Sequence, residues 1–329
     1  MPGMPGMDTM SNLSPLTWAS FFGTWRLEAG WLEAGVLILG AYLIARRSAR
    51  SSTVRPWRVA CFTTGIVLMW VCVASAIGAY AMAVFWMHMV LHLALIMVVP
   101  ALLVLGHPLT VLVEAFQGPA QERVRRVLRS WPVSALTHQA TGALLYSIVI
   151  IGTHLTGFMD QMARHGWLMT GEQVLYIVAG YLFLQPLLGE EPIRANPPYL
   201  LRLMIVVAAM IPDTIVGIVL LQTDTVPFPV MMSMHPSWAP DPISDIHAAG
   251  GLMWAAGDGL MMAIGIGIML GLISSPTKRD RMIGSWLEGA RRAALTEHTG
   301  SATAIEDADS DEALDAYNRM LARLHEQGR

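Results

Sequence analysis

The chain has 329 residues, of which 54% are hydrophobic and only 14% are charged, and its formal net charge is −3. A soluble domain carries about 25% charged residues, so this composition excludes an ordinary soluble protein and predicts a membrane protein. The sequence offers no phosphate-binding glycine loop, no nucleophile elbow, no paired CxxC motif and no basic aromatic patch for nucleic acid.

Apolar runs of roughly 20 residues, the length that spans a bilayer, recur along the chain. We expect seven of them to be transmembrane helices, because backbone polar groups in lipid must bond within the helix. The predicted organisation is all-α: an N-terminal Met-rich segment (1–30), a seven-helix membrane domain (31–275) and a polar cytoplasmic tail (276–329). In chain order the predicted spans are 31–45, 59–80, 87–106, 133–153, 168–188, 202–221 and 249–273.

Basic residues predict the orientation of these spans. With alternating spans, all Lys and Arg residues except Arg26 and Arg164 fall on one side. Loops rich in Lys and Arg lie in the cytoplasm, so we expect the N-terminus outside and the C-terminus inside. The start, Met1–Met10, lacks the basic and apolar regions of a cleavable signal peptide.

The most informative stretch opens the third span: Trp86-Met87-His88-Met89-Val90-Leu91-His92. His88 and His92 are four residues apart, so they lie on one face of a helix with Cβ atoms about 5–6 Å apart. Imidazole and thioether ligands suit copper, and thioethers favour Cu(I). This stretch therefore predicts a copper site. The alternative is that the histidines are interfacial polar residues and the methionines face lipid.

Other histidines and methionines gather on the same predicted outer side. His154 ends the fourth span, His247 precedes the seventh, and the long loop 222–247 contains Met231-Met232-Ser233-Met234-His235. No cysteine lies on this side, and in an oxidising compartment His and Met are more durable ligands than thiols. Whether this loop contacts the metal or only covers the helix bundle is open.

We expect His88, His92 and His154 to form a low-coordination Cu(I) site. Met89 or His247 would complete it. The lack of thiols disfavours tight zinc binding.

Three acids lie within predicted spans, where a charge is costly: Glu172, Asp213 and Asp258. Such acids can be ligands, can form a structural pair with a shared proton, or can orient a ligating histidine. We expect them behind the ligands or in a structural pair, and Asp258 to tune the site by contacting His92.

The order of these motifs resembles the multi-pass CtaG family of cytochrome c oxidase assembly proteins. The resemblance implies a bacterial inner-membrane chaperone, not an enzyme, that handles copper for a haem–copper oxidase. Its partners would be oxidase subunits, a periplasmic copper donor and the lipid bilayer, with no nucleic acid. The pieces that carry the resemblance are His88-x-x-x-His92 through Pro108, Thr153–Asp160, Gly180–Pro192 and Asp245–Asp258.

The chain departs from the family pattern at two positions. Gln173 stands where many members carry His, and His247 stands where members often carry Gln or Arg. The resemblance therefore implies that one ligand has moved from the fifth span to the seventh.

Two other functions fit the same residues. A copper importer or resistance protein of the CopD kind needs a polar path to the cytoplasm, but only His107 and His138 lie below the buried acids. A bis-His haem carrier would take its second axial ligand from His154 or His247.

Overall fold

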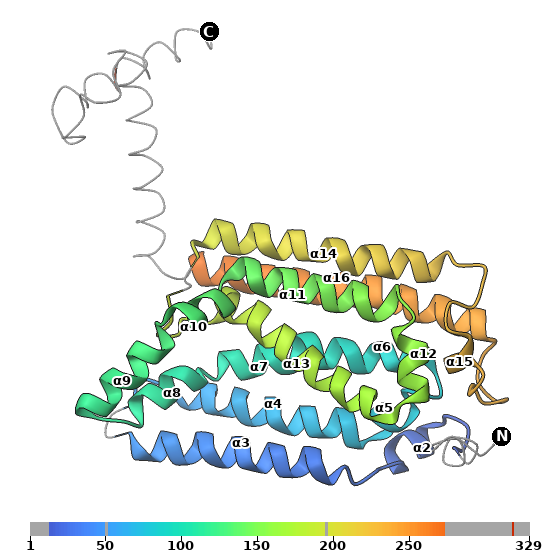
Figure 1. The fold of residues 1–329 in the computed structure, drawn as a ribbon, viewed down its shortest axis with the longest axis horizontal. Coiled ribbons are helices and arrows are strands. Elements are labelled where there is room, and N and C mark those ends of the chain that lie inside the picture. The colour runs from blue at the N-terminus through green and yellow to red at the C-terminus, as the bar shows by residue number, and fades with distance from the viewer. Residues whose placement is uncertain (1–12, 50–51, 195–196, 274–317, 319–329) are drawn as a thin grey trace. The chain divides into compact units, whose positions relative to one another are not determined.

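The structure is a computed structural model that describes residues 13–49, 52–194, 197–273 and 318. Every regular element in these ranges is a helix, which confirms the all-α prediction (Figure 1). The first residues of the Met-rich segment (1–12) and, apart from residue 318, the predicted tail lie outside the described residues. The helices below belong to one compact unit, Met1–Ile268, apart from the last residues of α16 (Pro242–Ile273).

Long apolar helices confirm the prediction of a membrane protein. Six are long and apolar enough to cross a bilayer, and a bent pair of helices brings the number to seven among the described residues. Helix termini alone do not fix the direction of the chain across a membrane, so the orientation stays a prediction. The spans are α3 (Ala29–Ser48), α4 with α5 (Pro56–Tyr80), α6 to α8 (Phe85–Glu114), the bent pair α11 and α12 (Gln139–His154 and Phe158–Arg164, at 68°), α13 (Gly166–Leu188), α14 (Tyr199–Leu221) and α16 (Pro242–Ile273).

The third span is interrupted twice. It consists of α6 (Phe85–Leu93), a π-helical turn η1 (Ala94–Val98), α7 (Val99–Leu105) and α8 (Pro108–Glu114). The second break is a left-handed turn at His107, with φ of 52°, directly before Pro108. The predicted end of this span at residue 106 agrees with the end of α7.

The fourth predicted span begins too early. A short helix, α10 (Trp131–Leu136), occupies its predicted start, and α11 begins only at Gln139. The imidazole of His138 accepts the backbone N–H of Ala140 and so starts a new helix at this point. Short helices that hydropathy does not reveal also lie outside the spans: α2 (Trp18–Gly23), α9 (Gly118–Leu128) and α15 (Pro229–Met232), the last within the long loop 222–247.

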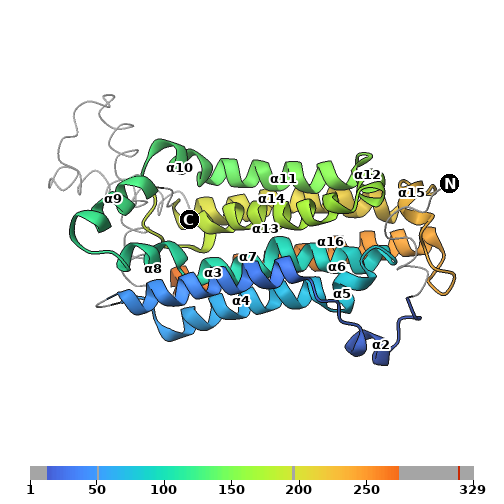
Figure 2. The same ribbon diagram turned by 60° about the horizontal axis from the view of Figure 1, so that its bottom comes forward.

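Glycines let two other spans pack closely against α13. A Cβ at Gly180 would collide with the carbonyl oxygen of Ile96 in η1, and one at Gly142 of α11 would lie 2.5 Å from the carbonyl oxygen of Leu182. Helix α13 therefore lies between α11 and the α6–η1–α7 span (Figures 1 and 2). These three spans carry the polar residues described next.

Candidate metal centre

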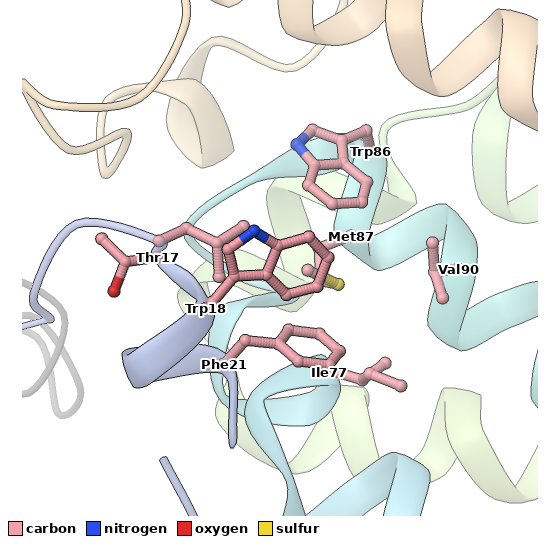
Figure 3. Close-up of a pocket in the computed structure, with 8 residues that line it drawn as sticks. Thr17, Trp18, Phe21, Ile77, Trp86, Met87 and Val90 are labelled. Carbon is pink, nitrogen blue, oxygen red and sulfur yellow. The ribbon is translucent and has the colours of Figure 1, made fainter. Parts of the chain in front are cut away.

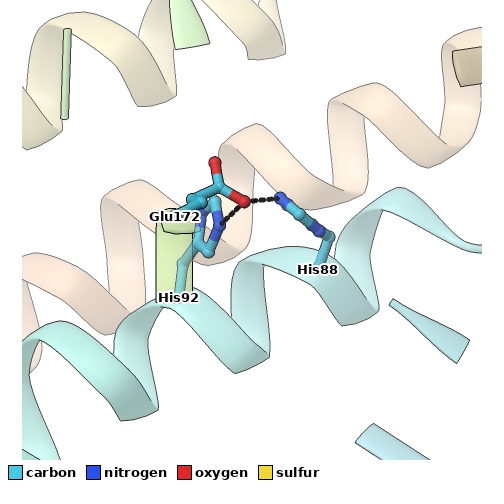
Figure 4. Close-up of side chains that lie close together, drawn as sticks. All are labelled: His88, His92 and Glu172. Carbon is cyan, nitrogen blue, oxygen red and sulfur yellow. Dashed lines mark ion pairs between the residues drawn. The ribbon is translucent and has the colours of Figure 1, made fainter. Parts of the chain in front are cut away.

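Three buried side chains from α6 and α13 converge on one point. Their imidazole and carboxylate atoms all lie within 4.8 Å of one another. Oε2 of Glu172 lies 3.3 Å from Nε2 of His92 and 3.6 Å from Nε2 of His88 (Figure 4). The sequence predicted that both histidines share a helix face, and the structure adds that Glu172 lies opposite that face.

The group is buried and several of its polar atoms have no partner in the part of the chain that the structure describes. His88, His92 and Glu172 are all buried, at 0%, 4% and 2% exposure. Among the described residues, Nε2 of both histidines and Oε1 of Glu172 have no hydrogen-bond partner. A buried polar atom without a partner costs about 1–3 kcal/mol, so this group is expected to hold something.

The surrounding hydrogen bonds assign the ring protons. Nδ1 of His154 lies 2.9 Å from the carbonyl oxygen of Ile150, which can only accept, so this nitrogen carries the proton. The lone pair on His154 Nε2 then accepts from Nδ1 of His92 at 3.3 Å. The Nε2 atom of neutral His92 is left with a lone pair that faces the Glu172 carboxylate. Two acceptors at this distance require a proton or a cation between them.

The contacts that hold His92 in place extend into α11 and α13. The hydroxyl of Thr153 donates to the carbonyl oxygen of Val149, and the hydroxyl of Tyr176 lies 2.7 Å from Thr153 Oγ1. The ring of Tyr176 packs against His92 with centroids 4.1 Å apart. Helix α13 therefore supplies both a carboxylate to one edge of His92 and an aromatic ring to its face.

Asp245 fixes the start of the helix that carries both histidines. Its buried carboxylate accepts the backbone N–H of Phe85 at 2.7 Å and that of Trp86 at 2.9 Å. These are the first amides of α6, and they have no acceptor within the helix. The carboxylate also lies 3.0 Å from Nε2 of His235. The sequence analysis missed this role, because nothing in the local pattern around residue 245 indicates that it caps a helix far away in the chain.

The turn that follows His92 is also unusual. The π-helix η1 begins two residues later, and its Val99 N–H donates to the carbonyl oxygen of Ala94. Single π-turns within α-helices are frequent at functional sites. Here η1 presents the Ile96 carbonyl to Gly180, which brings α13, and with it Glu172, close to α6.

Several predicted site residues lie outside this group. His154 contacts His92 but not Glu172, so it lies behind the candidate ligands. The expected move of a ligand to the seventh span is not observed, because Nε2 of His247 lies 2.8 Å from the carbonyl oxygen of Thr223. Met89 is buried in the apolar core, with no polar partner.

The predicted contact between Asp258 and His92 is wrong. Oδ2 of Asp258 accepts the hydroxyl of Thr214 at 3.1 Å, and His92 Nδ1 is already engaged with His154. Asp213 is fully buried and accepts the hydroxyl of Tyr146 at 2.5 Å. The acid beside the histidines is Glu172, which lies on the helix that faces them.

The opposite face of α6 borders an apolar cavity of about 470 Å³. Met87 and Trp86 line it together with Trp18 and Phe21 from the region of α2 (Figure 3). The thioether of Met87 therefore points away from Glu172. Of the loop methionines, Met231 is buried and its backbone N–H donates to Asp160.

The chain is similar to a known protein family and to three mycobacterial proteins. The sequence model of the cytochrome c oxidase caa3 assembly factor family, Caa3_CtaG, matches residues 40–275. The chain is 26% identical over 315 residues to an uncharacterized protein of Mycobacterium leprae, an alignment that covers 92% of this chain and 45% of the relative. It is 27% identical over 321 residues to uncharacterized proteins of Mycobacterium bovis and Mycobacterium tuberculosis, with 94% of this chain and 46% of each relative covered. The chain thus spans about half the length of these relatives. No solved structure matches it.

Proposed function

Because the chain belongs to the cytochrome c oxidase caa3 assembly factor family, we propose that it binds copper for the maturation of a haem–copper cytochrome c oxidase. The observation that carries the proposal is the lone pair of His92 Nε2, which faces the Glu172 carboxylate at 3.3 Å with no hydrogen bond between them. Membership of this family confirms the resemblance seen in the sequence, and it supports a role in oxidase assembly. On this proposal the protein is a chaperone in a bacterial inner membrane that holds an ion and releases it.

The chemistry of the group suits a copper ion. Ligands about 2 Å from one ion lie up to about 4 Å apart, which is close to the 4.8 Å limit found for these atoms. Two neutral imidazoles and one carboxylate give the group a single negative charge. A Cu(I) ion would cancel this charge, and a buried charge is tolerated only when it is paired.

The same donor set also suits zinc and ferrous iron, so the choice of metal must be tested. We choose copper because haem–copper oxidases, whose maturation the family resemblance implies, contain copper centres. Metal analysis of the purified protein separates the candidates. We expect about one Cu(I) ion per chain, because imidazole ligands suit copper.

The decisive variant removes both candidate imidazoles. His88→Ala/His92→Ala should lose the bound copper, and cells that carry it should lose oxidase activity that added copper partly restores. His247→Ala is the matched control, because this histidine is bonded to Thr223 and should not affect copper. Unchanged copper content in the double variant, or zinc or iron in place of copper in the unaltered protein, would reject the proposal.

The haem alternative has less support from the geometry. His92 Nδ1 and His154 Nε2 are 3.3 Å apart, so these two histidines cannot sandwich a porphyrin between them. A copper importer has one observation in its favour, the buried Asp213 and the half-buried Asp258 in the adjacent spans α14 and α16. Optical absorption of the purified protein tests the first alternative, and copper uptake into sealed vesicles tests the second.

A further inference from the structure

A second cavity, of about 260 Å³, lies at the same end of the bundle as the metal centre. Polar and thioether side chains line it together, since its walls include Arg26, Glu28, Met82, Met169, Thr170 and Gln173. We call this cavity the methionine vestibule. Glu28 and Thr170 are exposed, so the vestibule is open to the surroundings.

The vestibule and the metal centre share two segments of the chain. On α13, Met169 precedes Glu172 by three residues, so the two side chains are neighbours on the helix surface one turn apart. Gln173, directly after Glu172, is part of the vestibule wall. Met82 lies in the turn between α5 and α6, the helix that carries His88. Residues of the vestibule wall therefore lie within one helical turn of Glu172 along α13.

The lining chemistry differs from that of an apolar core. Methionine is a common filler between apolar side chains. Met82 belongs to the apolar core and Met169 packs against it, but both also line this cavity together with charged and amide side chains. Arg26 and Glu28 have opposite formal charges, so together they neither repel nor strongly attract a cation. Thioethers bind Cu(I) in preference to harder ions, whereas the inner group offers imidazoles and a carboxylate.

We propose that Met82 and Met169 form a second, weaker Cu(I) site through which copper reaches His88, His92 and Glu172. The destination rests on the proposed function above. Transfer occurs by ligand exchange: each step replaces one thioether by one imidazole while copper remains Cu(I), so no electron is transferred. Release to a partner follows the same path in reverse.

The test is an anaerobic titration of the purified full-length chain with Cu(I) against a coloured Cu(I) chelator. The unaltered protein should show a tight class and a weak class of copper. Met82→Leu/Met169→Leu, which conserves volume, should lose the weak class and keep the tight one. Loading of the tight class should become about tenfold slower, because a stabilised intermediate is removed.

Two further variants separate this proposal from the proposed function. His88→Ala/His92→Ala should lose the tight class and keep the weak one, with sulfur neighbours visible in X-ray absorption at the copper edge. Met159→Leu/Met162→Leu is the control, because these methionines are buried in α12 and do not line the vestibule.

The proposal is overturned if Met82→Leu/Met169→Leu has the stoichiometry and loading rate of the unaltered protein, or if the control pair loses the weak class equally. Absence of the tight class in the unaltered protein would reject only the proposed function, since the weak class is measured independently.

Discussion

The imidazole of His154 lies directly behind that of His92, with the two facing nitrogens 3.3 Å apart and the rings perpendicular at 89°. Because His154 also donates to the backbone of its own helix, it holds His92 in one tautomer and one orientation. This couples α11 to α6 at the point where Glu172 approaches. Residues that orient a metal-binding histidine in this way are often as important as the ligands themselves.

We therefore predict that His154→Leu weakens copper binding about 10–100-fold without abolishing it. This is the usual effect of removing a residue that orients a metal ligand. His154→Gln should recover part of the affinity, because its amide oxygen can accept the His92 N–H. Competition titration with a Cu(I) chelator measures both. A merely structural role for His154 would be indicated if the Leu and Gln variants bound copper equally well.

Glu172→Gln should separate metal binding from stability. The amide is nearly isosteric with the carboxylate, but it has N–H donors that can satisfy the imidazole lone pairs at 3.3 and 3.6 Å. We expect the metal-free variant to be at least as stable as the unaltered protein. Its copper affinity should fall by more than about 100-fold, which exceeds the effect of removing a residue that only orients a ligand. Thermal unfolding and copper titration test this pair of effects. A variant that is destabilised and yet binds copper normally would show that Glu172 is structural.

The sequence was sufficient for the part of the site that depends on local spacing. His88 and His92 are four residues apart on one apolar helix, so their common face follows from the helical repeat alone. The identity of Glu172 as an expensive buried acid also follows from the sequence. Its position opposite His92 does not, because hydropathy gives the spans and not which faces of two spans meet.

The misassigned residues show the same limit. Asp258 lies on the seventh span as predicted, and His247, expected just before it, lies within α16. The two residues bond to Thr214 and Thr223 of the preceding segment. Asp245 was overlooked because its partner amides lie 160 and 159 residues away. The packing of α13 depends on the π-turn carbonyl of Ile96 beside Gly180, and a π-turn leaves no clear trace in an apolar sequence.

A pH effect is expected at Glu191, which lies between α13 and α14. Its carboxylate accepts the backbone N–H of Leu109 and both the N–H and the hydroxyl of Thr110, at the start of α8. Burial raises the pKa of Glu191 above its ordinary value of 4.5. Folding therefore favours the protonated form, so this stabilisation is complete below the ordinary pKa and is lost as pH rises through the raised value.

The measurement is the unfolding temperature of the unaltered protein and of Glu191→Gln at a series of pH values. Gln does not titrate. The unfolding temperature of the unaltered protein should therefore fall relative to that of Glu191→Gln as pH rises from 4.5. A difference that does not depend on pH, or that changes in favour of the unaltered protein, would contradict the assigned direction.

The orientation of the spans can be tested with reporter fusions. Basic residues of α9 predict that this helix lies in the cytoplasm, whereas the loop after α14 should lie outside. A reporter that is active only outside should work after Thr225 and fail after Gln121 or at Arg329. Activity at Arg329 would reject the predicted direction, in which the metal centre is near the outer surface.

The cap that Asp245 provides should matter for a site it does not touch. Its two oxygens serve three donors: the first two amides of α6 and His235. Asn has only one acceptor oxygen, so Asp245→Asn leaves at least one buried donor without a partner, at a cost of about 1–3 kcal/mol. The first turn of α6 should then open more often, which moves His88 and weakens copper binding.

Asp241→Asn is the matched control, made four residues earlier. Asp241 is exposed and accepts the backbone N–H of Ile243 at 3.2 Å, a capping role that Asn fills equally well. We expect this control to keep both unfolding temperature and copper affinity, and Asp245→Asn to lower both. His235→Gln retains a side-chain donor for Asp245, so it should behave like the control if capping is the main role. Equal behaviour of Asp245→Asn and Asp241→Asn would show that α6 keeps its first turn without this carboxylate, and the link between the cap and the metal centre would then be wrong.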